Sequence, residues 1–471
     1  MFLRRRLDLF FLVFFMSVSF ITSACAEEHL AQTSYNLKVA LDPAQQTIAV
    51  RGTVVLPVSS LSSDLRFALH ETFVLKRLEV NGKPATFSFQ SEQHTPMRPA
   101  THIVVVSLPP DISRDSLRMN IEYEGKLKDL PEFGASNQSL AMDDQINPRL
   151  VELANYSSWY PQFGVFGAPI RIEMEVSLPQ GWTAICSGKK MEESTVGSRS
   201  MTRWSSPKDT DILITAAPNY KMKSAHLPGG DLEIYYTQLP DEFVTNEMRQ
   251  IEEVMKLFTE RLGETTIPAG TVKQVYSPKR HGQGRAGSAR PGMIVTSEGV
   301  TMDALAADRS FSLLQDVAHE IAHFWWNFGA GQGDWINEAF AEYYSAVAVQ
   351  NVASQEQFEN VLKYYRQQVK ELPFDAPSLS KVPFDGSGFV VRYYKGSLML
   401  DDLRHTLGDK QFFAASRDFF QQYEGKSAGT TDFRSFWKAR LGTQSDSLDT
   451  WLDSPGSTPG TRSEQQTGSH L

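Results

Sequence analysis

Residues 313–323 read Leu-Leu-Gln-Asp-Val-Ala-His-Glu-Ile-Ala-His, and this stretch decides the architecture of the second half of the chain. Residues four apart share one face of a helix, so His319 and His323 can present two imidazoles to one metal ion. Apolar residues recur through the stretch at the spacing of a buried helix face. Glu320 lies beside the metal-binding face and can take a proton from a water that the metal activates. The pattern therefore predicts a metal-dependent hydrolytic site on a helix.

The surroundings of this motif favour a catalytic metal site over a structural one. The chain has only two cysteines, Cys25 and Cys186, which excludes a zinc site built on cysteine. A structural zinc takes four protein ligands, whereas a catalytic zinc takes three and leaves one position open. The third ligand should be a downstream carboxylate, and two candidates, Glu338 and Glu342, lie one helical turn apart.

The downstream residues resemble the gluzincin aminopeptidase family, which includes aminopeptidase N and leukotriene hydrolase. Residues 335–341 read Trp-Ile-Asn-Glu-Ala-Phe-Ala, similar to the family's Trp-Leu-Asn-Glu-Gly-Phe-Ala, in which Glu binds zinc. The family has 18 residues between the second His and this Glu. Here 14 residues separate His323 from Glu338, and 18 separate it from Glu342. We expect Glu338 to be the ligand, since a loop can lose four residues without moving the helix that follows it.

The resemblance also assigns roles to Glu342 and to a tyrosine. Ligand histidines usually donate their free ring N–H to a carboxylate, and similarity to thermolysin gives Glu342 that role, with His319 as the expected donor. Residues 393–397 read Tyr-Tyr-Lys-Gly-Ser, similar to the family's Tyr-Glu-Lys-Gly-Ala. Tyr393, rather than Tyr394, would then donate its neutral hydroxyl to the oxyanion. The alternatives are a solvated helix charge for Glu342 and a core aromatic residue for Tyr393.

One family motif is missing. The family recognises the free amine of its substrate with the Glu of a Gly-Ala-Met-Glu-Asn box, and here Ala289 or Arg290 stands at that position. No acidic residue occurs from 277 to 292, and the segment also carries Lys279, Arg280 and Arg285. We hypothesise a glycine-rich basic loop over the cleft that favours a substrate carboxylate or backbone over an amine. The alternative is a solvated flexible loop.

Within this segment we expect Arg290, Gly292 and Met293 to contact substrate. The strand Met293–Val295 should pair with the substrate backbone by β-addition.

The chain divides into two domains by its hydrophobic pattern. Up to about residue 238 the pattern is strand-like, with alternation at Ile48–Leu56 and Ile170–Leu178 and turn signals between such runs, which favours an all-β domain of antiparallel sheets. Apolar residues then recur with a helical period, first at Glu242–Leu262. We predict an N-terminal antiparallel, saddle-like β domain at 27–239. By the resemblance, a thermolysin-like, mostly helical catalytic domain follows at 240–453.

The two ends of the chain carry their own predictions. Residues 1–26 combine three arginines, an apolar run and Ala24-Cys25-Ala26, which is typical of a secretory signal. Lipid attachment at Cys25 and an uncleaved anchor are the alternatives, and each version exports the body of the protein to the periplasm or beyond. Residues 454–471 are rich in Ser, Gly and Thr, and we expect a disordered tail. The family's large C-terminal helical domain has no counterpart, so we expect a more open cleft.

Composition limits the function. The chain has 471 residues, 41% hydrophobic and 21% charged, as in an ordinary globular protein. A net charge of −9 argues against nucleic-acid binding, and no later segment approaches 18 consecutive apolar residues. We predict a zinc metallopeptidase that binds one Zn²⁺ per chain and acts on peptides. The alternatives to an aminopeptidase are an endopeptidase, a carboxyl-end peptidase and an inert peptide-binding relative; the oligomeric state stays open.

Overall fold

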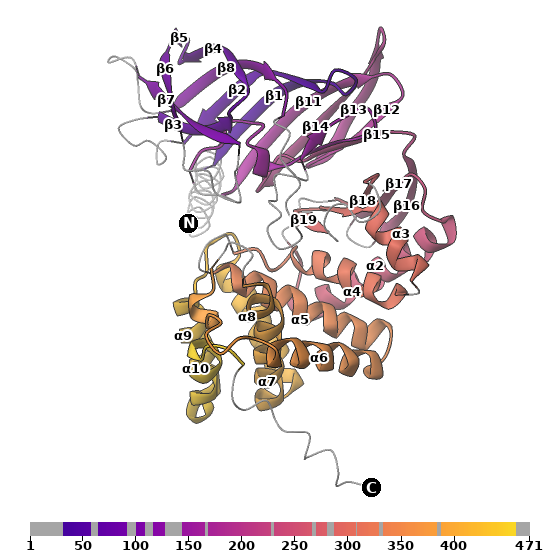
Figure 1. Ribbon diagram of the computed structural model, residues 1–471, viewed down its shortest axis with the longest axis vertical. Helices are drawn as coiled ribbons and strands as arrows, with labels where there is room; N and C mark the ends of the chain where they lie inside the picture. Colours follow the sequence, from indigo (N-terminus) through magenta and orange to yellow (C-terminus); the bar gives the residue numbers. More distant parts are fainter. Residues whose placement is uncertain are drawn as a thin grey trace, which may run out of the picture.

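The structure is a computed structural model, and it describes most of the chain (Figure 1). The described residues are 32–57, 65–91, 100–108, 116–127, 144–164, 168–227, 230–265, 270–279, 287–307, 309–328, 333–383 and 388–457. The predicted signal at 1–26, with Cys25, lies outside these ranges, as does most of the predicted tail.

Alternating apolar residues build the large sheet of the first domain. In β1, for example, buried and exposed residues alternate from Leu37 to Leu41, so one face of the strand enters the core. The eight strands are, in spatial order, β13 (Lys189–Val196), β14 (Arg199–Asp209), β11 (Ile170–Pro179), β1 (Thr33–Asp42), β2 (Thr47–Leu56), β8 (Leu117–Gly125), β4 (Val74–Val80) and β5 (Lys83–Pro84). Neighbours pair antiparallel, as expected, except that β1 and β11 run parallel.

Two smaller sheets complete this domain. The first contains β3 (Leu65–His70), β7 (Thr101–Ser107) and β6 (Thr86–Ser91); the second contains β12 (Trp182–Cys186), β15 (Ile214–Pro218), β10 (Val151–Leu153) and β9 (Gln145–Ile146). A 3-10 turn, η3 (Asn155–Ser157), follows β10. Trp159 and Trp204 are fully buried in the core that these sheets share.

The second domain begins earlier than its helical pattern indicates. Two strands of the predicted N-terminal domain join a sheet with strands from beyond the expected boundary at 239/240. This sheet contains, in order, β16 (Lys221–Leu227), β17 (Gly230–Tyr236), β18 (Gly270–Ser277), β20 (Met293–Ser297) and β19 (Ser288–Arg290). Alternation identifies a strand but does not say which sheet it joins, so the pattern at 221–236 looks the same in either domain.

Helices form the rest of the second domain, mainly below the sheets in the view of Figure 1. They are α2 (Asp241–Leu262), α3 (Glu298–Ala306), α4 (Ser310–Ala322), α5 (Asp334–Val352), α6 (Gln355–Lys370), α7 (Gly396–Leu407), α8 (Asp409–Tyr423), α9 (Thr430–Leu441) and α10 (Asp446–Asp453), with short turns η4 (Leu379–Lys381), η5 (Val391–Lys395) and η6 (Gly442–Gln444). Helix α5 is buried on all sides up to Val349, because α4, α6 and α7 pack around it. None of the described helices is long and apolar enough to cross a membrane.

The start of the predicted tail is packed rather than free. The Nζ of Lys395, a fully buried lysine, donates hydrogen bonds to the carbonyls of Ser454 (2.6 Å) and Gly456 (2.8 Å). The N–H of Gly456 donates to the carbonyl of Ala376. Polar composition predicts disorder because it offers no apolar surface, but backbone carbonyls can still be held by a buried cation. Residues 458–471 lie outside the described part of the chain.

Three cations of the second domain join it to the first. Lys273 donates to the carbonyls of Cys186 and Gly188. Lys279 and Arg290 form ion pairs with two buried carboxylates of the first domain, Glu152 (2.7 Å) and Asp211 (3.0 Å). The interface between the domains is therefore fixed next to β19, the strand that leads into the candidate site.

Candidate metal centre and active site

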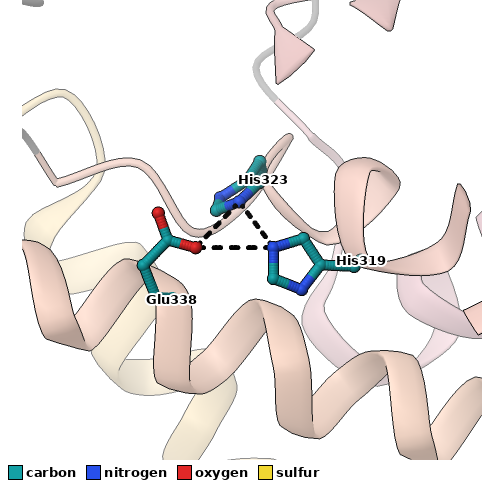
Figure 2. Close-up of side chains that lie close together, drawn as sticks. All are labelled: His319, His323 and Glu338. Atoms are coloured by element: carbon teal, nitrogen blue, oxygen red, sulfur yellow. Dashed lines mark hydrogen bonds and ion pairs between the residues drawn. The ribbon is translucent and has the colours of Figure 1, made fainter. Parts of the chain in front are cut away.

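Two neighbouring helices bring three ligand atoms together. His319 lies on α4, His323 directly follows it, and Glu338 lies in the second turn of α5; their side chains point toward one another (Figure 2). The Nε2 atoms of His319 and His323 are 3.2 Å apart. Oε2 of Glu338 lies 3.4 Å from the first of these nitrogens and 3.6 Å from the second.

These distances fit a zinc ion. Ligands placed about 2.0–2.1 Å from a tetrahedral zinc are separated by about 3.3–3.4 Å from one another. The carboxylate oxygen at the centre of the group, Oε2 of Glu338, is buried and accepts no hydrogen bond from any residue that the structure describes. A buried oxygen of this kind needs a positive partner, and a divalent cation between the three atoms supplies one. Two imidazoles and one carboxylate are also the ligand types of a catalytic zinc site.

The other ring nitrogen of each histidine is already engaged, which leaves Nε2 for the metal. Nδ1 of His319 donates to Oε2 of Glu342 (2.8 Å), and Nδ1 of His323 donates to the carbonyl of Trp326 (3.1 Å). The other oxygen of Glu342 accepts hydrogen bonds from Tyr365 (2.6 Å) and Gln315 (3.2 Å). Glu342 thus orients a ligand, and Glu338 completes the ligand group, as the sequence box predicts.

The three ligand side chains shift one another's pKa values. Burial alone would raise the pKa of Glu338, but the charges of His323 and His319 lower it well below its ordinary value. The carboxylate is therefore ionised. For His319 burial would lower the pKa, and Glu338 and Glu342 instead hold it well above the usual range. In the absence of metal His319 therefore holds a proton, which a bound metal ion would displace.

Glu320 lies beside this group, on the same helix as His319. Burial raises its pKa, against the opposing charges of the two ligand histidines, so the carboxylate binds a proton more readily than an exposed glutamate does. Backbone passes very close to it, because a Cβ atom added to Gly287 would lie 2.7 Å from Oε1 of Glu320. The residue that precedes β19 therefore covers one side of the proposed base, and only glycine fits there without displacement.

Tyr393 is the sixth predicted residue in the site. It lies in η5, a single π-helical turn, and its ring stacks parallel to the ring of His319, with 5.5 Å between centroids. Phe389 stacks on Tyr393 at 4.2 Å. Burial, together with the charge of Glu338, raises the pKa of Tyr393 well above its ordinary value. The phenol therefore keeps its proton and can donate a hydrogen bond into the site.

Comparison with known proteins identifies the second domain. Residues 289–451 match the family model described as the peptidase family M1 domain. The chain carries an M1 peptidase domain. With its His-His-Glu group it is a zinc metallopeptidase. No curated protein matches the chain in sequence.

Solved structures share the two-domain architecture of this metallopeptidase. A mutant M1 zinc metallopeptidase from Deinococcus radiodurans, bound to a Tyr-Ser-Ala substrate, superposes with a TM-score of 0.69 at 15% identity. The match covers 91% of this chain and 95% of that one. Leukotriene A4 hydrolase from Saccharomyces cerevisiae superposes with a TM-score of 0.67 at 17% identity, over 91% of this chain and 68% of the hydrolase. At these identities the likeness shows the fold.

The M1 domain does not place Met293 and Gly292 in contact with substrate. Met293 is fully buried, and its strand, β20, is hydrogen-bonded to β18 on one side and β19 on the other. A strand paired on both sides cannot add a further strand, so β-addition to Met293–Val295 is excluded. Gly292 is buried in the turn between β19 and β20, where its φ of +71° suits glycine. The strand at this edge of the sheet is β19, and β16 lies at the other edge.

Arg290 is also engaged within the protein rather than free to bind a substrate carboxylate. Its Nε donates to Asp211 (3.0 Å), and its terminal nitrogens donate to Tyr156 (3.1 Å) and to the carbonyl of Ala289 (2.8 Å). The expected basic loop is therefore neutralised at Arg290 and at Lys279, its two cations that the structure describes. The sequence could not reveal this, because Asp211 lies 79 positions away in another domain.

One buried ion pair near the zinc ligands was not predicted from the sequence. Asp334, in the first turn of α5, lies 2.7 Å from Arg392 of η5, and both side chains are buried. The pair joins the helix that carries Glu338 to the turn that carries Tyr393. An aspartate one turn before the zinc-binding glutamate is visible in the sequence, but nothing there indicates its partner.

Proposed function

We propose that this metallopeptidase hydrolyses peptide bonds with Glu320 as general base and Tyr393 as the donor to the developing oxyanion. The observation that carries the proposal is the position of both side chains beside one three-ligand group: a glutamate whose pKa is raised, and a phenol that keeps its proton. Bound zinc supplies Lewis acidity, which lowers the pKa of a water and polarises the carbonyl of the scissile bond.

The side chains of the site would perform the proton transfers and stabilise the developing charge. Glu320 takes a proton from the attacking water and later delivers it to the departing nitrogen. The hydroxyl of Tyr393 hydrogen-bonds to the carbonyl oxygen as negative charge develops on it. His319 and Glu338 are held in position by Glu342 and by burial in the helix pair, so the site is organised before substrate arrives.

We propose that β19, rather than β20, pairs with the substrate backbone. It lies at one edge of its sheet and contacts α4, and a Cβ atom added to Gly287, just before it, would meet Glu320. An extended peptide added to this edge would pass directly along the proposed base.

The substrate is proposed to be a peptide whose N-terminus need not be free. The Deinococcus radiodurans relative is bound to a Tyr-Ser-Ala substrate, which supports a peptide as the substrate class. However, no carboxylate occurs from 277 to 292 to bind an α-amine, and Arg290 stands close enough for its charge to act on Glu320. This favours cleavage of N-blocked peptides, as by an endopeptidase, over strict aminopeptidase action.

Cleavage mapping tests this proposal. Matched peptides with free and acetylated N-termini are incubated with zinc-loaded wild type and with Glu320→Gln, and the products are identified by mass spectrometry. We expect wild type to cut both peptide forms and the variant to cut neither. Cleavage of the free-amine form alone would establish an aminopeptidase. If wild type is as inert as the variant across a broad library, the chain is a peptide-binding relative.

We also propose that the protein acts outside the cytoplasm, as residues 1–26 indicate. The mass of the mature N-terminus separates the versions: loss of 26 residues, a lipid on Cys25, or an intact leader. An intact leader together with cytoplasmic fractionation would refute export.

A further inference from the structure

Asp316 is a carboxylate on α4, the helix that also carries His319 and Glu320. It lies one turn before Glu320, so the two side chains project from the same face of the helix. Its side chain is exposed, and no other residue in the described part of the chain forms a hydrogen bond or an ion pair with it. Desolvation and the charges of Glu342 and Glu320 raise the pKa of this carboxyl group to about 6, against the opposing charge of His319.

Aromatic rings lie near this carboxylate. Tyr394 packs edge to face against two other rings. Its ring centroid lies 5.6 Å from that of Tyr364 and 5.4 Å from that of Phe389. We call these three residues the aromatic wall. Tyr364 is 52% exposed and Phe389 is 44% exposed, so the wall presents ring surface to solvent.

Two interactions link the aromatic wall to the helix segment that carries Asp316. The preceding residue, Gln315, donates to the hydroxyl of Tyr365 (2.6 Å), whose ring stacks on Tyr394 at 4.7 Å. The negative charge of Asp316 also acts on the hydroxyl of Tyr394 and raises its pKa. Through Gln315 and Tyr365, the helix that carries Asp316 and Glu320 is thus joined to the aromatic wall.

Within the described part of the chain, no cation forms an ion pair with Asp316. Arg290 and Lys279 are held by Asp211 and Glu152. The charge of Arg309 reaches Asp316, but these two exposed residues do not form an ion pair. A carboxylate bordered by aromatic rings and lacking an internal partner is the arrangement that attracts an ammonium or guanidinium group, which gains from the charge and from the ring faces.

We infer that Asp316, with the aromatic wall, forms a subsite that selects substrates carrying a cationic group close to the scissile bond. The inference rests on the proposed peptidase function and adds a substrate class to it. The cation is a lysine or arginine side chain, and the α-amine of the substrate is the other source of the same chemistry.

The test compares cleavage of peptides that differ by one charge. Peptides acetylated and amidated at their ends carry lysine, arginine, norleucine, glutamine or glutamate at each position flanking the mapped bond. We expect wild type to cleave the lysine and arginine peptides with kcat/KM about tenfold above the norleucine peptide, a ratio that falls with added salt. Asp316→Asn should bring the ratio close to one, and Asp316→Glu, which keeps the charge, should restore it.

Matched controls separate this effect from a loss of fold. Asp375→Asn makes the same substitution at an exposed aspartate remote from the site and should keep the wild-type ratio. Zinc content and thermal unfolding show whether each variant is folded, and Asp316→Lys should shift preference toward the glutamate peptide. In a second arm the norleucine peptide has a free N-terminus; if its advantage over the acetylated form is lost in Asp316→Asn, the α-amine is the bound cation.

The outcomes are distinguishable. If wild type cleaves these peptides with no preference for a cation, or if Asp316→Asn keeps the preference, the subsite does not exist although the peptidase function stands. If wild type cleaves none of the peptides in either terminal form, the proposed function itself fails.

Discussion

Nδ1 of His319 lies 2.8 Å from Oε2 of Glu342, and this contact separates the two carboxylates that compete for the role of third zinc ligand. Glu342 is turned toward the back of the histidine ring, while Oε2 of Glu338 faces the two Nε2 atoms. The four-residue difference in spacing is therefore absorbed before α5, and the ligand keeps its place in the helix.

The first prediction follows from that contact. Replacing Glu342 with Gln keeps an acceptor for His319 but removes the negative charge, and we expect zinc affinity to fall about 10–100-fold. Competition with a chromophoric chelator measures the affinity, and Glu356→Gln, an exposed residue of α6, is the matched control. An unchanged affinity would refute the orienting role. A loss as complete as that of Glu338→Gln would make Glu342 a ligand.

Gly287 gives the second prediction. A methyl group there would meet Glu320 at 2.7 Å, so Gly287→Ala must displace either the base or the strand. We expect kcat to fall about 100-fold, as for other displacements near 1 Å, with zinc content unchanged. Gly429→Ala is the control, because its new Cβ makes only an ordinary contact at 3.7 Å. Full activity of Gly287→Ala would show that the backbone before β19 does not confine Glu320.

The third prediction concerns the ion pair between Asp334 and Arg392. Arg392→Gln leaves a buried carboxylate uncompensated near Glu338, and such losses destabilise proteins by about 3–5 kcal/mol. Adding Asp334→Asn should recover part of this free energy of unfolding, because the unpaired charge is then gone. Urea denaturation gives the free energy of unfolding of wild type, both single variants and the double variant, which together form a double-mutant cycle. Strictly additive effects would mean that the two side chains do not interact.

The fourth prediction concerns pH and Glu247. This glutamate is buried on α2 and accepts a hydrogen bond from Tyr276, and burial raises its pKa from 4.5 to about 8. The folded state thus keeps a proton that the unfolded state releases above about pH 4.5. The stabilising contribution of Glu247 is fully present below that pH and is lost as the pH rises toward about 8.

Glu247→Gln should therefore flatten the fall in unfolding free energy between about pH 5 and pH 8. Denaturant titrations across that range provide the measurement. Glu252→Gln, an exposed neighbour on the same helix, should leave the slope as in wild type. A Glu247→Gln profile that keeps the wild-type slope would show that Glu247 does not bind the proton.

Local sequence patterns predict the metal site and the start of the helical domain. Helical periodicity at Glu242–Leu262 locates α2 to within about two residues at each end. The His-Glu-x-x-His spacing and the Trp-Ile-Asn-Glu box predict His319, His323 and Glu338 because every ligand lies on one of two helices. A helix fixes the relative direction of side chains three and four positions apart, so sequence spacing translates directly into geometry.

Features that depend on long-range pairing could not be predicted this way. The assignment of β16 and β17 to the second domain depends on the pairing of β17 with β18 and of β16 with β17. Alternation of apolar residues does not indicate which strands pair. The burial of Met293 depends on β20 being central in its sheet. Arg290 loses its predicted role because a carboxylate from another domain reaches it. In each case the deciding contact joins segments that no local pattern connects.

The central claim is that one zinc ion and Glu320 together make this protein a peptidase, and a single comparison tests it most directly. Zinc content and single-turnover cleavage of a peptide found by the mapping are measured for wild type and Glu320→Gln. We predict one zinc ion per chain in both proteins and a cleavage rate at least about 1,000-fold lower in the variant. A wild type that binds no zinc, or a Glu320→Gln variant that cleaves as fast as wild type, would contradict the claim.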